Sequence, residues 1–345
     1  MNAEEAVQEN RLFKRKSYFG TYQRLFLFCT ELICLISVIT INSLYFNLDL
    51  NSKLGVYALC RVILNITLST SRFILILVLV VKSKAKASYL DSLHSIGVHQ
   101  DHELKRFITQ QQLYKNIVFA TFLILQYATN VWHFININIY SGLRKSIHTI
   151  MLFTFPAVYL LILREIVDVC IHLQAAFKLV NSKVNSLLNN QPTNLASLTC
   201  CRLNYSYAVK ATKAVENYFR YFVTFYFVKY ACYSIINIVL TFGGSNDTYW
   251  IFHTIVETLL MIYLTVYLVS VNLLSRKCLD SLYELSFKMK RLDMKYENEI
   301  FIGRVLFTDV GFTFANLFTI NTQFIASMFT LSLTIILALA NFLYQ

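Results

Sequence analysis

Residues 318–345 read FTINTQFIASMFTLSLTIILALANFLYQ, and no charged residue occurs anywhere between Val310 and Gln345. The hydrocarbon core of a bilayer is about 30 Å thick, so roughly 20 helical residues are enough to cross it. A run of this length without charge predicts a membrane-spanning helix rather than the core helix of a soluble domain.

Six more apolar runs of similar length precede this one. They cover residues 25–46, 55–81, 116–139, 148–172, 219–242 and 249–272. Composition agrees, because 56% of the 345 residues are hydrophobic and only 14% are charged, whereas soluble domains carry about 25% charged residues. The sequence therefore predicts an all-α polytopic membrane protein with seven transmembrane helices.

The distribution of Lys and Arg predicts how the chain is oriented. Most of the 31 basic residues lie before the first run or in every second loop after it, and few lie in the other loops. Cytoplasmic loops are enriched in Lys and Arg, so we expect a cytoplasmic N-terminus and an extracellular C-terminus. This orientation, with outer loops that lack cysteine, disfavours a G-protein-coupled receptor.

The runs and the loops between them predict four parts. These are a cytoplasmic N-terminus over 1–24, six helices within 25–272 with inner loops 82–115 and 173–218, a cytoplasmic helical anchor segment over 273–317, and the seventh helix over 318–345. Within the second long inner loop, the polar stretch NNQPTN at 189–194 predicts a break between helices.

The anchor segment has the pattern of an amphipathic helix. Leu282, Leu285, Met289 and Leu292 recur at three- and four-residue spacing within 273–300. Such a helix either lies on the membrane surface or extends the sixth and seventh helices into a cytoplasmic bundle, and we prefer the bundle.

Composition also excludes several classes of function. The net charge of +12 does not indicate nucleic-acid binding, because the basic residues alternate with membrane-length runs. The eight cysteines include no CxxC with a histidine partner, so we expect no zinc site. With no nucleophile–base pair and no metal-ligand cluster in a span, we expect neither an enzyme nor a bound cofactor.

The C-terminal run resembles the end of the insect gustatory receptor family. The last span of that family carries T-Y, five mostly apolar residues and then Q-F. Here Thr334-Ile335, ILALA and Asn341-Phe342 keep this spacing, with Asn in place of Gln and Ile in place of Tyr. Upstream, the residues FTIN at 318–321 are similar to the family's aromatic, apolar and Asp/Asn stretch.

This resemblance implies a ligand-gated cation channel in the plasma membrane of a sensory neuron. Family members are homo- or heterotetramers, in which the last helix of each subunit lines one central pore. The cytoplasmic parts of helices four to seven anchor the subunits together, and a small-molecule tastant binds within each subunit in an outward pocket. No G protein is required.

The pore prediction concerns one face of the last helix. Thr334, Ala338 and Asn341 share that face, which Leu331 and Met328 continue inward. We expect Asn341 and Phe342 to form the constriction, with uncharged amide groups facing the ions and apolar residues closing the pore by dewetting. The alternative is that Asn341 caps the helix at the membrane surface.

A ligand pocket should be mostly apolar, with a few polar groups. Eight residues in the outer halves of the predicted helices fit this description: Arg61, Trp132, His133, Tyr159, Tyr233, Asn237, His253 and Glu257. The alternative for the aromatic residues is that Trp and Tyr favour membrane interfaces in any case. Arg61 and Glu257 lie at matching depths, so they either pair with each other or contact ligand.

The other charges inside the runs need partners, because an isolated charge in a bilayer is costly. We expect Glu31 to pair with Arg72, and Lys229 to pair with Glu165 or Asp168. Two other functions remain open: a receptor of the odorant branch, and a polytopic transporter. The transporter is disfavoured because the runs show no internal repeat and no pairs interrupted by Gly or Pro.

Overall fold

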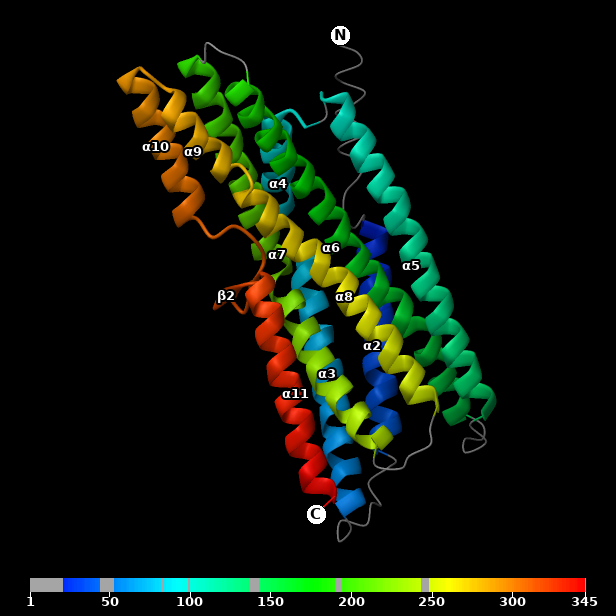
Figure 1. Cartoon of the computed structure of the whole chain (residues 1–345). Coiled ribbons are helices and arrows are strands. Elements are labelled where there is room, and N and C mark those ends of the chain that lie inside the picture. The colour runs from blue at the N-terminus through cyan, green and yellow to red at the C-terminus, as the bar shows by residue number, and fades with distance from the viewer. Residues whose placement is uncertain are drawn as a thin grey trace. The chain divides into compact units, whose positions relative to one another are not determined.

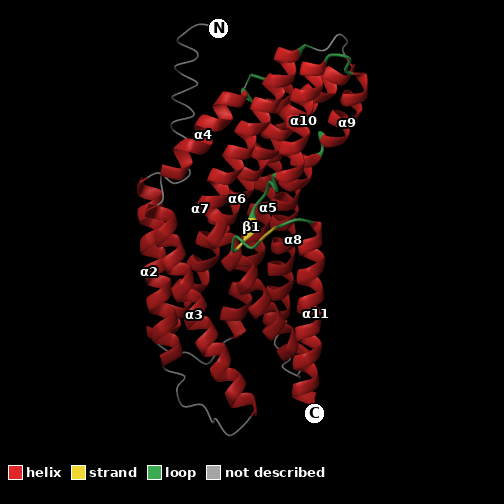
Figure 2. Ribbon diagram, turned by 90° about the vertical axis from the view of Figure 1, so that its left-hand side faces the viewer, coloured by secondary structure: helices red, strands yellow, loops and turns green. Residues whose placement is uncertain are grey.

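The computed structural model describes residues 21–43, 53–81, 84–98, 100–136, 143–189, 194–242 and 248–344. Almost all of them are helical (Figures 1 and 2). The helices are α2 (Thr21–Ser43), α3 (Lys53–Val81), α4 (Lys84–Ile96), α5 (His102–Asn136), α6 (Leu143–Asn189), α7 (Leu195–Phe242), α8 (Thr248–Arg276), α9 (Leu279–Lys288), α10 (Leu292–Phe307) and α11 (Thr322–Tyr344).

The chain forms two compact units. The first contains Met1–Val81 and Ile139–Leu161, and the second contains Lys82–Asn138 and Ile162–Gln345. In the first unit α2 packs against α3. In the second unit α7 packs against α4, α8, α10 and α11, and α5 packs against α8.

Side-chain caps define where several helices begin. The Asp101 carboxylate accepts hydrogen bonds from the backbone N–H groups of Glu103 and Leu104 at the start of α5. Asn194 accepts one from Ala196 at the start of α7. Such caps satisfy N–H groups that have no partner within the helix. The break predicted at 189–194 is confirmed, since α6 ends at Asn189 and α7 begins at Leu195.

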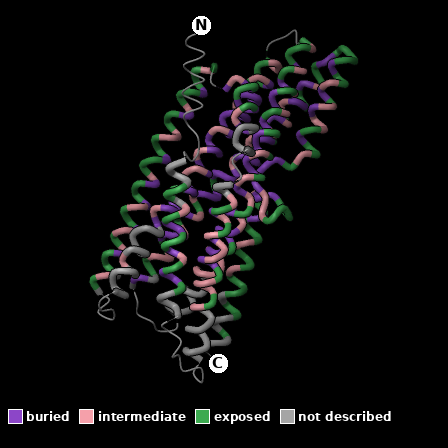
Figure 3. The backbone as a smooth tube through the Cα atoms, turned by 180° about the vertical axis from the view of Figure 1, so that it is seen from behind, coloured by how far each residue is buried: buried purple, intermediate pink, exposed green. Residues whose placement is uncertain are grey.

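The helices of the second unit bury one face and expose an apolar one. Along α8, Val256, Leu260, Leu264 and Leu268 are buried, and buried and exposed positions alternate along the helices in Figure 3. Large exposed apolar patches are unusual on water-soluble proteins, and a lipid environment accounts for them. The exposed face of α8 comprises Ile251, Phe252, Ile255, Leu259, Ile262 and Val266.

Apolar length alone singles out fewer spans than the sequence predicts. Within the described ranges, Ile251–Lys288 is the one helical stretch long and apolar enough to cross a membrane. Shorter apolar helical stretches cover Phe28–Ile39, Val62–Val78 and Thr322–Ile335. The number of seven crossings therefore stays a prediction.

A small β-hairpin joins α10 to α11. Strands β1 (Thr313–Phe314) and β2 (Phe318–Thr319) are antiparallel, and Thr313 pairs with Thr319. Figure 2 shows the hairpin between the end of α10 and the start of α11. Its turn has positive φ angles at Ala315 (51°) and Asn316 (62°). Residues of a right-handed α-helix have negative φ angles, so the chain cannot be helical here.

Two boundaries in this region differ from the prediction. The amphipathic helix expected through 273–300 is divided into α9 and α10, because the chain is extended at Met289 and Arg291. The last helix begins at Thr322 rather than at 318, because Phe318 and Thr319 form β2. The Asn321 side chain then caps α11 by accepting a hydrogen bond of 2.9 Å from the Phe324 N–H.

Candidate functional site

Glu257 lies at the centre of a buried polar cluster formed by three helices of the second unit. It projects from α8 with 6% of its surface exposed. Lys229 of α7 places its Nζ 3.4 Å from Oε2, and Gln126 of α5 donates a hydrogen bond of 3.3 Å from Nε2 to Oε1. Burying a carboxylate is costly unless it is paired and hydrogen-bonded, and this one is both.

Lys229 forms an ion pair that the sequence analysis did not predict. We expected Glu165 or Asp168 of α6, but Lys229 pairs with Glu257. The physical reason is that α7 packs against α8, while Asp168 forms an ion pair with Lys115 of α5. The expected alternative pairing of Glu257 with Arg61 lies outside the described side chains.

Further polar and aromatic contacts extend the cluster along α5 and α8. Asn130, one turn beyond Gln126, is buried and accepts a hydrogen bond of 3.3 Å from the Tyr249 hydroxyl. The rings of Tyr249 and His253 have centroids 5.8 Å apart. The cluster thus combines an ion pair, amides and aromatic rings, the mixture that a small-molecule site uses.

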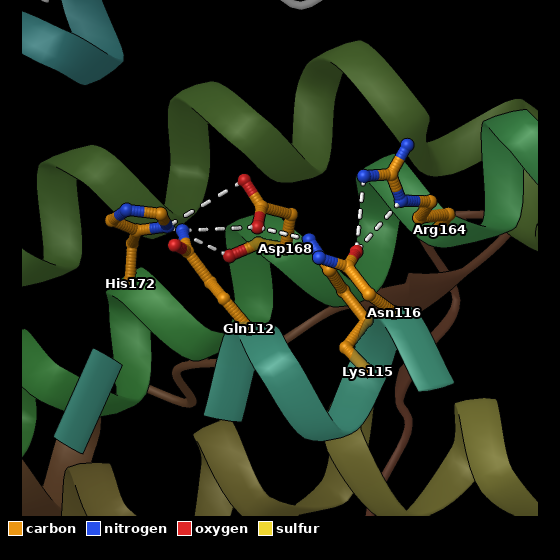
Figure 4. Close-up of polar contacts among 6 residues, drawn as sticks. All are labelled: Gln112, Lys115, Asn116, Arg164, Asp168 and His172. Atoms are coloured by element: carbon orange, nitrogen blue, oxygen red, sulfur yellow. Dashed lines mark hydrogen bonds and ion pairs between the residues drawn. The ribbon is translucent and has the colours of Figure 1, made fainter. Parts of the chain in front are cut away.

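A second polar group joins α5 to α6 (Figure 4). The Asp168 carboxylate forms an ion pair with the Lys115 ammonium and accepts a hydrogen bond of 3.3 Å from the Gln112 amide. His172 Nδ1 lies 2.8 Å from the backbone carbonyl oxygen of Asp168, so Nδ1 carries the hydrogen in this bond. These contacts satisfy the charges within the protein and favour a structural role over ligand binding.

Arg164 and Asn116 continue this α5–α6 contact in Figure 4. The Arg164 Nε and Nη2 donate to the Asn116 side-chain oxygen at 3.1 and 3.0 Å. In the first unit, the Arg72 Nε lies 2.7 Å from Glu31 Oε2, and both side chains are buried. This is the Glu31–Arg72 pairing that the sequence predicts.

The predicted ligand residues are distributed over several environments. His253 and Glu257 belong to the cluster, and Tyr233 is half-buried on α7. Trp132 is 59% exposed, which is typical of a residue at a membrane interface, and Tyr159 is buried within the first unit. The side chains of Arg61, His133 and Asn237 lie outside the described residues.

Three members of the cluster were missed by the sequence reasoning. Gln126 and Asn130 lie in a charge-free run, and Tyr249 lies next to a predicted outer loop. A signal was present, because an amide inside a membrane helix needs a partner just as a charge does. Among the described residues, no group of three His, Cys, Asp or Glu could hold a metal ion.

The described part of α11 presents one face to the rest of the unit. Phe324 is buried, and Met328 and Ser332 are half-buried, at the four-residue spacing of one helix face. Thr334, Ala338 and Asn341 are exposed on other sides of the helix, while the Phe342 side chain lies outside the described residues. Met328 therefore does not continue the face of Asn341, because it turns towards α7, against which α11 packs.

No family model and no curated protein matches the chain. Solved structures do match it in fold. The insect olfactory receptor OR5 from Machilis hrabei in complex with eugenol superposes with a TM-score of 0.65 and 11% identity, covering 93% of this chain and 98% of that one. A second structure of the same receptor gives a TM-score of 0.63 and 10% identity, covering 93% and 88%. The chain shares the fold of these two olfactory receptor structures.

This shared fold confirms the predicted fold class, an all-helical polytopic membrane protein. It also accounts for the exposed apolar face of α8, which a soluble fold would bury. Because the identities are only 10–11%, the roles of the side chains in the site are interpreted from this chain alone.

Proposed function

We propose that this protein is a gustatory receptor subunit that acts as a ligand-gated, non-selective cation channel. The observation that carries the proposal is the match in fold over nearly the whole length of an insect olfactory receptor that was solved with a small molecule, eugenol. The C-terminal spacing of Thr334, Asn341 and Phe342 favours the gustatory branch.

The pore in this proposal is lined by the polar stripe of α11. Apart from Ser332, the described polar residues in the body of this helix fall on one exposed side, away from Phe324. Hydroxyl and amide groups offer dipoles but no fixed charge, so four such helices around one axis would pass cations with little selectivity. The stripe comprises Gln323, Ser327, Thr330, Thr334 and Asn341.

Exposed apolar residues at α9 and α10 support assembly into a tetramer through the anchor segment. Phe287 is 87% exposed and Phe307 is 89% exposed, and Leu292 and Tyr296 are exposed on the same two helices. Such patches mark protein–protein or membrane contacts. We assign them to neighbouring subunits, with the N-terminus cytoplasmic, the receptor in the plasma membrane and no G protein required.

The ligand in this proposal is a small-molecule tastant that binds at the Glu257 cluster. The cluster lies between α5, α7 and α8, where polar groups are surrounded by buried apolar residues such as Phe122 and Leu260. A receptor of the odorant branch is the second candidate, because the two solved structures named above are olfactory receptors.

Whole-cell recording tests the channel and its pore face together. Cells that express the chain are exposed to eugenol and a panel of tastants, and wild type is compared with Asn341→Ala, Asn341→Asp and the control Ser332→Ala on the opposite face. We expect evoked cation current without added G protein, and altered selectivity or block only in the Asn341 variants. Current that is indifferent to both Asn341 variants would retain the channel but reject this pore face.

Two further readouts decide the rest of the proposal. An N-terminal epitope that antibodies reach on intact cells would contradict the orientation. Responses confined to volatile odorants would favour the odorant branch, whereas responses confined to involatile tastants would favour the gustatory branch.

A further inference from the structure

The carbonyl oxygen of Gln126 is buried without a hydrogen-bond partner among the described residues. The side chain is 5% exposed, and its Nε2 donates to Glu257 while Oε1 remains unsatisfied. The amide cannot be turned round, because Oε1 would then face a carboxylate oxygen. The acceptor is therefore a fixed feature of the cluster.

A second polar atom close by is in the same situation. The hydroxyl oxygen of Thr254 is buried without a partner in the described part of the chain. Thr254 precedes Glu257 by three residues on α8, so their side chains are neighbours on the helix surface. Buried polar atoms in native proteins are almost always satisfied by protein, water or ligand. Two unsatisfied atoms beside one ion pair indicate that something else completes this site.

The charge and the apolar surroundings of the site limit which molecule can complete it. The Glu257 carboxylate and the Lys229 ammonium neutralise each other at 3.4 Å. A cationic or anionic ligand would bring an uncompensated charge into a buried site, which is costly. Phe122, one turn before Gln126 on α5, and Val256 and Leu260, on either side of Glu257 on α8, are all buried.

We propose that Gln126 determines specificity by accepting a hydrogen bond from the hydroxyl or N–H group of an uncharged, largely apolar ligand. Amines and carboxylates are excluded by the neutralised ion pair, and ligands without a donor leave Oε1 unsatisfied. This inference rests on the proposed function, because it assigns the ligand class to the same cluster.

Matched aromatic probes test the inference on the purified full-length protein in detergent. Benzyl alcohol and anisole are isomers, but only the alcohol can donate a hydrogen bond, and benzylamine and benzoate add a positive and a negative charge. The midpoint of thermal unfolding is measured against probe concentration for wild type, Gln126→Leu and the control Gln110→Leu, which alters an exposed residue of the same helix. Gln126→Met provides a second variant of similar side-chain length.

We expect benzyl alcohol to stabilise wild type and Gln110→Leu at concentrations about tenfold lower than anisole, the effect of one hydrogen bond. In Gln126→Leu and Gln126→Met the two isomers should become equivalent. Equal effects of the isomers on wild type, stronger effects of the charged probes, or an alcohol preference that survives both variants would overturn the inference.

No stabilisation by any probe would also overturn it, and would assign Oε1 to a bound water. Evoked current in the recordings described above would then leave the channel proposal standing. Binding of probes without preference for the alcohol would likewise reject the role of Gln126 alone.

Discussion

The hydroxyl group of Thr313, in strand β1, donates a hydrogen bond to the carboxylate of Glu216 on α7. Arg220 binds the same carboxylate one turn further along the helix. The Ala315 N–H donates to the Thr224 hydroxyl at 2.8 Å. Thr313 and Glu216 thus belong to a series of contacts that attach the hairpin before α11 to α7.

The hairpin region is attached to α8 as well. The Asn272 amide donates to the Asp309 carboxylate at 3.2 Å and to the Val310 carbonyl at 2.8 Å. Arg276 lies 2.8 Å from Asp309. The segment that leads into the proposed pore helix is therefore held by α7 and α8, the two helices that carry Lys229 and Glu257.

Replacing Thr313 by Val should loosen this attachment. The change removes one hydrogen bond to a charged acceptor, so we expect the free energy of unfolding to fall by about 1.5–3 kcal/mol. Thermal unfolding of the purified protein measures the loss. The control is Thr121→Val, since that exposed hydroxyl bonds only within its own helix. Equal stability of the two variants would contradict the role of the Glu216 contact.

Glu257→Gln should destabilise the protein more strongly. It removes the negative charge that lies 3.4 Å from the buried Lys229 ammonium, and breaking a buried ion pair in this way costs about 3–5 kcal/mol. Combining it with Lys229→Met also removes the positive charge of the Lys229 ammonium, so the double variant should be more stable than Glu257→Gln alone. The free energies of thermal unfolding of wild type, the two single variants and the double variant form a double-mutant cycle. Strictly additive losses would mean that the two side chains do not interact.

Cysteine reactivity should differ sharply between neighbouring positions. Burial raises the pKa of the Cys201 thiol to about 11 and that of Cys278 to about 12, whereas Cys200 is exposed. At pH 7.5 N-ethylmaleimide should therefore label Cys200, and should label Cys201 and Cys278 only after denaturation, because the thiolate is the reactive form. Mass spectrometry of the modified peptides measures this.

The same pKa shifts predict how stability responds to alkali. Both folded-state values lie above the ordinary thiol pKa of 9.0. The unfolded chain therefore ionises first, and stability should fall as the pH rises from about 9 towards 11 and 12. A Cys201→Ala, Cys278→Ala variant should lose less stability across this interval, and an unchanged alkaline profile would contradict the assignment.

Gly311→Ala should distort the hairpin. A Cβ atom at this position would lie 2.8 Å from Thr319 Cγ2, closer than two carbon atoms can approach. We expect a loss of about 1–3 kcal/mol, partly restored by Thr319→Ser, which removes that methyl group. Gly303→Ala is the control, because the nearest atom to a Cβ at this position is 3.9 Å away. Within a helix, alanine is also more stable than glycine by about 1 kcal/mol. Equal effects of the two substitutions would contradict this account.

The sequence predicted the features that depend on local composition. Apolar runs located the helices, NNQPTN located the break between α6 and α7, and the charges of Glu31 and Arg72 indicated a pair. Each of these inferences needs only a run of residues or a count of charges. The fold class follows from the same information.

Features that depend on which helices are neighbours were not predictable in this way. For Lys229 the sequence suggested only Glu165 or Asp168, both on α6, and the pairing with Glu257 follows from the packing of α7 against α8. Gln126 was missed because an amide in an apolar run carries no charge to mark it. The hairpin was missed because its residues, TFANLFT at 313–319, are as apolar as the helix that follows.

Helix α7 runs without interruption for 48 residues, which at 1.5 Å per residue is about 70 Å. Lys229 and Glu216 both lie on α7, separated by about 20 Å along the helix axis. A tilt of about 5° centred at Lys229 would move the Thr313 contact by about 2 Å, most of the length of a hydrogen bond. A small rotation of this helix beside the Glu257 cluster would therefore become a larger displacement where the last helix begins.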